Sequence, residues 1–201
     1  MNKENLLIIF ARNPVLGKVK TRLAREIGNE RALQIYLKLL EHTHKVAEDA
    51  DCDKHVYYTE NLDEFGLLDY FKYKKKLQEG ENLGERMHHA MKNGFDKGYR
   101  RVVIIGSDCI ELNTELIDRA FEQLTTSDCV LGPASDGGYY LIGLRVMQDF
   151  LFQDKTWSGS DVLLDTILDL QNAQMSFELL PTLNDIDTKA DLDLLQNLIA
   201  E

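Results

Sequence analysis

A cluster of basic residues follows the first strongly apolar stretch of the sequence. These residue types can bind an anionic ligand. Residues 12–25 carry a charge of +5 and include no acidic residue, whereas the whole chain carries −11. Such concentrated positive charge repels itself unless an anion binds to it, and guanidinium and ammonium groups are suited to phosphate. The cations of this segment are Arg12, Lys18, Lys20, Arg22 and Arg25. The segment therefore indicates a phosphate-binding loop.

Known phosphate-binding motifs do not match this loop. A Walker A motif requires glycine at position 12 and a hydroxyl residue at position 19, where the chain has Arg12 and Val19. No G-x-G-x-x-G motif follows the first apolar stretch, so a dinucleotide site is unsupported. Pro14 and Gly17 favour a sharp turn that brings backbone N–H groups towards an anion. The alternative is an exposed helix face beginning near Gly17, whose cations neutralise surrounding acids.

A carboxylate, Asp108, follows the apolar residues 101–106, with Ser107 between them. In open α/β sheets, ligands bind beyond the carboxyl ends of the strands. Mg²⁺ commonly uses one or two carboxylates together with substrate phosphates. Asp108 is therefore a candidate metal ligand, although an aspartate that ends a strand also serves as a turn residue.

A glycine-rich loop lies between residues 131 and 143. It contains Asp136, Gly137 and Gly138 and continues into Tyr139. Glycines let a ligand approach the backbone, and the aspartate and tyrosine offer polar groups beside it. The same letters also fit a simple hairpin turn, and both interpretations stay open.

Two further segments contain candidate site residues. Asp185 and Asp187 precede the last predicted helix and offer a second metal ligand if the fold brings them to Asp108, although acids before a helix are favourable without any function. Trp157, the only tryptophan, is a candidate to pack on a sugar or base, or else a core residue. His42, His44, His88 and His89 lack a glutamate or cysteine partner at metal-binding spacing and are interpreted as ordinary helix residues.

The elements that must position these residues alternate along the chain. Apolar runs and 3.6-residue periodicities predict strands and helices in a βα order, which favours a mostly parallel sheet covered on both faces. We expect an α/β fold, a three-layer α/β/α sandwich, in a single domain over residues 1–201. The predicted strands are 6–10, 55–59, 101–106, 129–131, 139–144 and 175–180, and the predicted helices are 30–48, 83–95, 113–124, 160–171 and 188–200. Residues 72–76, rich in lysine, are interpreted as solvated surface.

Composition excludes several classes of protein. A net charge of −11 argues against nucleic-acid binding, and 44% hydrophobic residues argue against disorder. The apolar run near the start is too short for a signal peptide, and no stretch approaches a membrane span. Three scattered cysteines form no C-x-x-C pair, so we expect a cytoplasmic location. The sequence leaves the oligomeric state open, including a homodimer.

Five stretches together resemble one family. They are FARNPVLGKVKTRLA from Phe10, NLGERM from Asn82, IIGSDC from Ile104, LGPASDGGYYLIGL from Leu131 and DIDTKADL from Asp185. In this order they are similar to small bacterial glycosyltransferase-like proteins with a GT-A, or nucleotide-diphospho-sugar transferase, fold. That family has been known as a domain of unknown function and is linked to arsenosugar biosynthesis. Ile110 stands where the family usually has proline, which loosens the turn after Asp108.

The resemblance implies a role for each candidate residue. Asp108 and Asp187 would bind Mg²⁺ or Mn²⁺, and Asp108 and Asp136 would be catalytic, with Asp136 facing the sugar or the acceptor. The nucleotide and its diphosphate would contact the basic loop and the other cleft residues. These substrate-binding positions are Ala11, Arg12, Gly17, Lys18, Lys20, Arg22, Ser107, Gly137, Gly138, Tyr139 and Trp157.

The implied activity is a metal-dependent glycosyltransferase that moves a sugar from a nucleoside-diphosphate donor to a small soluble acceptor. One alternative is a nucleotidyltransferase, which attacks the α-phosphorus and releases pyrophosphate. Another is a nucleotide-binding module without turnover. The residues alone do not decide among them, nor do they identify the base, the sugar or the acceptor.

Overall fold

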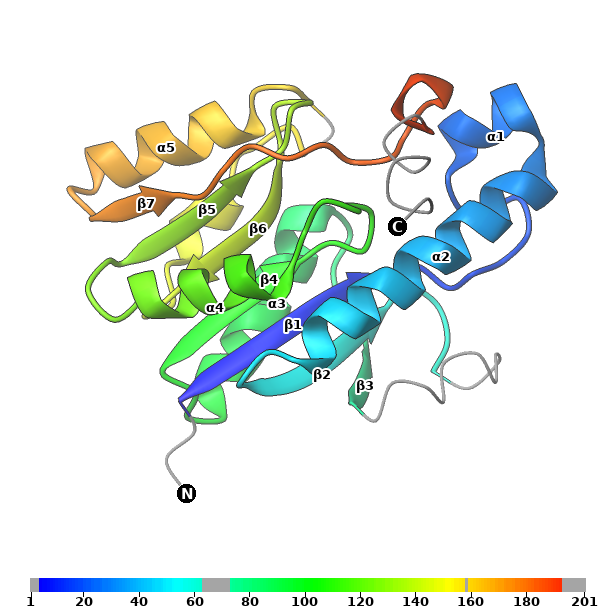
Figure 1. The fold of residues 1–201 in the computed structure, drawn as a ribbon. Helices are drawn as coiled ribbons and strands as arrows, with labels where there is room; N and C mark the ends of the chain where they lie inside the picture. Colours follow the sequence, from blue (N-terminus) through cyan, green and yellow to red (C-terminus); the bar gives the residue numbers. More distant parts are fainter. Residues whose placement is uncertain (1–3, 63–72, 158, 193–201) are drawn as a thin grey trace.

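The computed structural model describes residues 4–62, 73–157 and 159–192. Within these ranges the strands form one seven-stranded sheet of order β3-β2-β1-β4-β6-β5-β7 (Figure 1). Only β6 runs antiparallel to its neighbours among these described strands. The strands are β1 (Asn5–Ala11), β2 (Asp53–Tyr58), β3 (Lys74–Leu77), β4 (Arg101–Ile105), β5 (Cys129–Pro133), β6 (Tyr139–Leu144) and β7 (Phe177–Leu179). The predicted mostly parallel sheet is confirmed.

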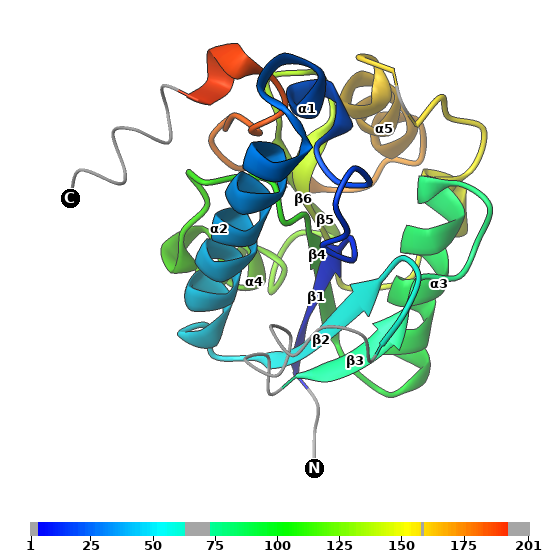
Figure 2. The same cartoon turned by 90° about the vertical axis from the view of Figure 1, so that its right-hand side faces the viewer.

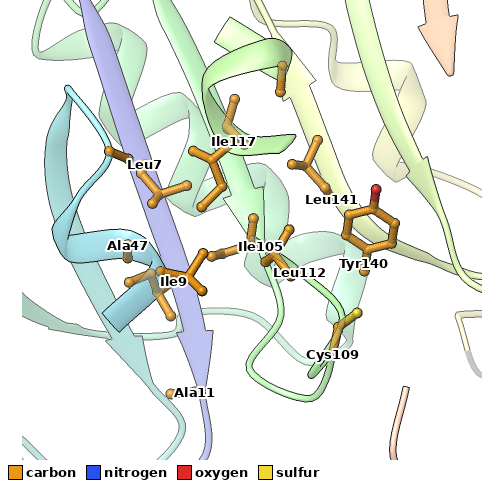
Figure 3. Close-up of a cluster of buried hydrophobic side chains, with 14 of the residues drawn as sticks. Leu7, Ile9, Ala11, Ala47, Ile105, Cys109, Leu112, Ile117, Tyr140 and Leu141 are labelled. Carbon is orange, nitrogen blue, oxygen red and sulfur yellow. The ribbon is translucent and has the colours of Figure 1, made fainter. Parts of the chain in front are cut away.

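Helices cover both faces of the sheet. Helices α2 (Asn29–Glu48) and α4 (Thr114–Gln123) pack on one face, and α3 (Leu83–Asp96) and α5 (Val162–Asn172) on the other (Figure 2). Successive side chains of a strand point to opposite faces. Leu7 and Ile9 of β1 therefore join the hydrophobic cluster under α2 and α4 (Figure 3). Leu6 and Ile8 join the cluster under α3 and α5. Because both faces are buried, the strand reads as a continuous apolar run. The three-layer sandwich is confirmed.

Local sequence signals explain where two of the helices begin. The side-chain oxygen of Asn82 accepts a hydrogen bond from the N–H of Glu85 at 3.0 Å, and Asn113 does the same for Leu116 at 3.0 Å. These caps satisfy backbone donors that have no partner within the helix. They fix the first turns of α3 and α4, and the first turn of α3 borders the cleft described below.

Two elements differ from the sequence-based expectation. Residues 74–76, interpreted as solvated surface, belong to the edge strand β3. Lysines at the edge of a sheet still reach solvent, and they protect the edge from pairing with other chains. In place of the start of the closing helix predicted at 188–200, the structure has a 3₁₀ turn, Lys189–Asp191. Thr188 and Asp191 form a capping box there, so the helix-start signal is real but is followed by a short turn. Residues 193–200 lie outside the described residues.

The short helix α1 (Thr21–Ile27) follows the basic loop. Arg22 and Arg25 are exposed on it, as the alternative of a cationic helix face expects, but Arg22 also lines the cleft described below. Lys20, directly before α1, is buried. None of the helices in the described ranges is long and apolar enough to cross a membrane.

The buried imidazole of His55 on β2 predicts an acid-dependent loss of stability. Burial lowers the pKa of His55 to about 4, helped by the Lys76 and Lys97 ammonium groups. In the unfolded chain the pKa is about 6.5, so below that pH the unfolded chain binds a proton that the folded protein does not. The contribution to the free energy of unfolding is therefore complete above pH 6.5 and is lost as the pH falls towards 4.

Replacing His55 by phenylalanine should remove this part of the pH dependence. Between pH 6.5 and 5, we expect the free energy of unfolding of the wild type to fall by up to roughly 2 kcal/mol more than that of His55→Phe. Urea unfolding of both proteins at the two pH values measures the difference. Equal losses in the two proteins would contradict the assignment.

Candidate active site

The carboxyl ends of β1 and β4 lie side by side, because Ile9 of β1 pairs in parallel with Ile105 of β4. The basic loop leaves β1 at this edge, and Asp108 follows β4 at the same edge. The segment before the 3₁₀ turn also reaches it, since the N–H of Ile186 donates to the carbonyl of Asp108 at 3.1 Å. Figure 1 shows the 3₁₀ turn itself, in red, beside α1. Segments far apart in the sequence thus meet above the sheet.

A cleft of about 500 Å³ opens where these segments meet. Its walls come from the basic loop, Asp108, the glycine-rich loop, the start of α3 and the segment around Trp157. It holds nine of the predicted site residues: Arg12, Lys20, Arg22, Asp108, Asp136, Gly138, Tyr139, Trp157 and Asp187. Thus most of the predicted site lies on one surface.

Lys20 is the central cation of this cleft. Its Nζ lies 3.1 Å from Oδ2 of Asp108 and 3.0 Å from Oδ1 of Asp187. The lysine side chain is only 4% exposed, whereas the two carboxylates are 45% and 41% exposed. Burial by itself lowers the pKa of the Lys20 ammonium, but the carboxylates of Asp108 and Asp187 outweigh it and leave the pKa raised. A buried positive charge therefore joins two acids from distant parts of the chain.

Asp185, which the sequence offers together with Asp187 as a second metal ligand, also lines the cleft. It lies two residues before Asp187, and it forms an antiparallel bridge with Cys109. Burial raises the pKa of Asp185 to about 7, and the neighbouring charge of Asp108 contributes in the same direction. The signal for it was its place in the same D-x-D pair as Asp187.

Tyr36 of α2 holds the loops after β1 and β4 together. Its buried hydroxyl accepts a hydrogen bond from the N–H of Arg12 at 2.7 Å and donates to the carbonyl of Arg12 at 3.0 Å. The same hydroxyl lies 3.4 Å from Oγ of Ser107. Tyr36 lies within the helix predicted at residues 30–48, and no local motif revealed these contacts.

Asn13 is a second residue whose role was not foreseen. Its buried side-chain oxygen accepts hydrogen bonds from the N–H of Glu60 at 2.9 Å and from the N–H of Asn61 at 3.3 Å. Its amide nitrogen donates to the carbonyl of Asn61 at 2.8 Å. The side chain therefore fastens the basic loop to the chain that follows β2.

Truncating Asn13 should release this attachment. In Asn13→Ala, the N–H groups of Glu60 and Asn61 lose their acceptor, which should lower the free energy of unfolding by about 2 kcal/mol. Urea unfolding measures the loss. Thr59→Val, which removes only one 3.3 Å bond to Asn13, serves as the milder comparison. If the two variants were equally stable, Asn13 would not be the main attachment of the loop.

The glycine-rich loop presents Asp136 to the cleft. Oδ1 of Asp136 accepts a hydrogen bond from the N–H of Gly138 at 2.9 Å, which fixes the carboxylate at the exposed tip. Tyr139 lines the cleft, and burial raises the pKa of its phenol. Gly137 is not among the residues that line the main cleft; it lies against the backbone of Ser160.

Trp157 closes one side of the cleft against α3. A Cβ atom at Gly84 would lie only 2.3 Å from the indole ring, so the tryptophan packs directly on the helix backbone. This close contact explains why glycine stands in the NLGERM stretch. Trp157 borders the main cleft and an adjoining cavity of about 690 Å³.

The remaining predicted residues lie next to the main cleft. Ala11 and Ser107 line the adjoining cavity, together with Arg86 and Gln78. Lys18 lines a smaller cavity of about 260 Å³ and pairs with Glu60 at 2.9 Å. Gly17 is not among the residues that line these three cavities. The basic loop thus borders three cavities, all of which Arg12 lines.

The fold is that of nucleotide-diphospho-sugar transferases. A protein from Desulfovibrio desulfuricans G20, provisionally named as such a transferase, is 35% identical over 96% of this chain and 86% of its own, with a TM-score of 0.91. Residues 42–159 match the family described as uncharacterized protein conserved in bacteria (DUF2064). The chain belongs to this family. No protein with a curated description matches the sequence.

More distant structures share the fold alone. CMP:2-keto-3-deoxy-manno-octonic acid synthetase, solved in complex with CTP, is 11% identical over 98% of this chain and 99% of its own, with a TM-score of 0.62. Rv0371c from Mycobacterium tuberculosis H37Rv, solved in complex with manganese, is 12% identical over 98% of this chain and its full length, with a TM-score of 0.59.

Proposed function

We propose that the cleft binds a nucleoside-diphosphate sugar with a divalent cation and transfers the sugar to a small acceptor. The observation that carries the proposal is the meeting of Lys20, Asp108 and Asp187 in one cleft that Arg12 also lines. The cationic side chains of this set can bind a diphosphate, and its carboxylates can bind a metal ion at the same time. The resemblance to the Desulfovibrio protein supports the same substrate class.

The donor groups suit Mg²⁺ or Mn²⁺. Asp108 and Asp187 are half-exposed oxygen donors, and both already lie within 3.1 Å of one cation, the Lys20 ammonium. Among the described residues, no three acidic, histidine or cysteine side chains are arranged to enclose a metal ion. The two aspartates would therefore hold the ion together with substrate phosphates, as is usual for Mg²⁺. When bound, the ion supplies positive charge to the departing diphosphate.

The side chains of the cleft would bind the diphosphate and take a proton from the acceptor. Lys20, Arg12 and Arg22 would bind the diphosphate oxygens and stabilise the negative charge that forms there. An acceptor oxygen attacks the anomeric carbon, the bond from that carbon to the β-phosphate oxygen breaks, and the nucleoside diphosphate leaves. Asp136, exposed at the mouth of the cleft, is the group that we expect to take the proton of the acceptor hydroxyl.

Nucleotidyl transfer is the second candidate function. The CTP complex of a protein with the same fold favours it, because that fold also accepts a nucleoside triphosphate. The two reactions break different bonds: sugar transfer releases nucleoside diphosphate, whereas attack at the α-phosphorus releases pyrophosphate. The product therefore separates them.

The fluorescence of Trp157 provides the test, because it is the only tryptophan and borders the cleft. We expect one of a panel of UDP-, GDP-, CDP- and ADP-sugars to change its emission and raise the melting temperature in the presence of Mn²⁺. Release of nucleoside diphosphate on adding acceptors then supports sugar transfer. Pyrophosphate release from a triphosphate supports the second candidate, and binding without either product indicates a nucleotide-binding module.

A further inference from the structure

The carboxylate pair proposed to hold a metal ion already has a counter-ion within the protein. The Lys20 ammonium lies 3.1 Å from Asp108 and 3.0 Å from Asp187, and Arg22 is 3.7 Å from the second oxygen of Asp187. The backbone of Lys20 is left-handed, with φ of 46°, at the residue that precedes α1. This is a conformation that residues with a side chain rarely adopt.

We propose that Lys20 is the built-in counter-ion of this pair, so that Asp108 and Asp187 take up a divalent cation together with a nucleoside diphosphate rather than alone. The proposal rests on the function proposed above. It adds to that function that the divalent cation and the phosphates bind together, and not the cation first.

A metal ion bound by Asp108 and Asp187 would displace the Lys20 ammonium from both carboxylates. The lysine side chain is 4% exposed, so an ammonium displaced from both carboxylates would be left in a buried place without a partner. Losing one member of a buried ion pair is strongly unfavourable. A divalent cation arriving alone brings this cost with it. A diphosphate removes the cost, because its oxygens give the displaced ammonium and Arg22 new acceptors.

Removing the Lys20 charge should therefore have opposite effects on the two ligands. In Lys20→Met, Mn²⁺ measured without nucleotide should bind at least about tenfold more tightly, because two half-exposed carboxylates lose their internal cation. Binding of CDP, UDP, GDP or ADP, followed by Trp157 fluorescence, should weaken in the same variant. The signal of free Mn²⁺ in electron paramagnetic resonance measures the first quantity without any turnover.

Lys18→Met is the matched control. It removes the same charge from the same loop, but Lys18 is exposed and pairs with Glu60 rather than with the cleft aspartates. We expect its Mn²⁺ affinity to change by less than about threefold, since exposed pairs contribute little. An unchanged or weaker Mn²⁺ affinity in Lys20→Met, or an equal gain in both variants, would overturn the proposal.

A measurement on the wild type needs no variant to fold. Reductive methylation followed by mass spectrometry should label Lys20 slowly in the free protein and faster when Mn²⁺ alone is present at high concentration. Lys155, a buried lysine that pairs with Asp169 on α5, serves as the internal control and should not respond. Labelling of Lys20 that does not respond to Mn²⁺ would also overturn the proposal.

The outcomes distinguish this proposal from the function on which it rests. If Lys20→Met gains Mn²⁺ affinity but no nucleotide binds to either protein, the counter-ion role stands and the proposed function fails. If the wild type binds and turns over a nucleotide sugar but Lys20→Met gains no Mn²⁺ affinity, only the counter-ion role is wrong.

Discussion

With asparagine in place of Asp108, the protein is expected to fold normally and to turn over its substrates about a thousandfold more slowly. The change keeps the size of the side chain and removes one of the two carboxylates that face Lys20. It leaves the carbonyl of residue 108, which accepts the hydrogen bond from Ile186, untouched. The rate of nucleoside diphosphate release at saturating Mn²⁺, with the donor found in the fluorescence screen, measures the loss.

Asp118→Asn is the matched control for this prediction. Asp118 is an exposed acid on α4, and the variant has the same change in net charge. We expect it to keep wild-type turnover, while both variants keep wild-type melting temperatures within a few degrees. An Asp108→Asn protein with turnover within tenfold of the wild type would show that this carboxylate is not needed for the reaction.

The architecture was predictable because burial leaves a strong pattern in the sequence. Strands buried on both faces, such as β1 and β4, are continuous apolar runs, and the helices that cover them show 3.6-residue periodicity. The edge strand β3 escaped prediction because its pattern is set by solvent and not by a core. Lysines at positions 74–76 look like loop surface unless the neighbouring β2 is already in place.

The candidate site was predictable to the extent that its residues follow strands. Parallel strands end at the same edge, so Asp108 after β4 and the loop after β1 had to lie close together. Contacts between residues far apart in the sequence could not be predicted, because no local motif marks them. Asn13 reaches Glu60, and Tyr36 reaches Ser107, through side chains whose letters look like ordinary loop and core residues.

Charge counting identified the basic loop but not the different tasks of its cations. Lys20 is buried against two aspartates, Lys18 pairs with Glu60, and Arg22 is exposed on α1. These positions depend on the left-handed backbone at Lys20 before α1, and on residues 185–187 lying at the same sheet edge. Only the assembled fold shows that a lysine stands between the two carboxylates proposed as metal ligands.

The largest loss of stability is expected from Gly137→Ala in the glycine-rich loop. A Cβ atom at this position would lie 1.9 Å from the carbonyl oxygen of Ser160, and φ of 92° is unfavourable for any residue with a side chain. The carbonyl of Gly137 also accepts the N–H of Leu163 at 3.0 Å, which ties the loop to α5. Neither the loop nor the helix can move away without breaking this bond.

We therefore expect Gly137→Ala to lower the free energy of unfolding by at least about 3 kcal/mol in urea. Gly98→Ala separates the two causes, because Gly98 has φ of 87° but no atom within 4 Å of the added Cβ, and it should cost about 1 kcal/mol. Equal losses in the two variants would show that the backbone angle alone matters. A larger loss at Gly137, with slower turnover at temperatures where the variant stays folded, would show that close packing on Ser160 is what places Asp136 at the mouth of the cleft.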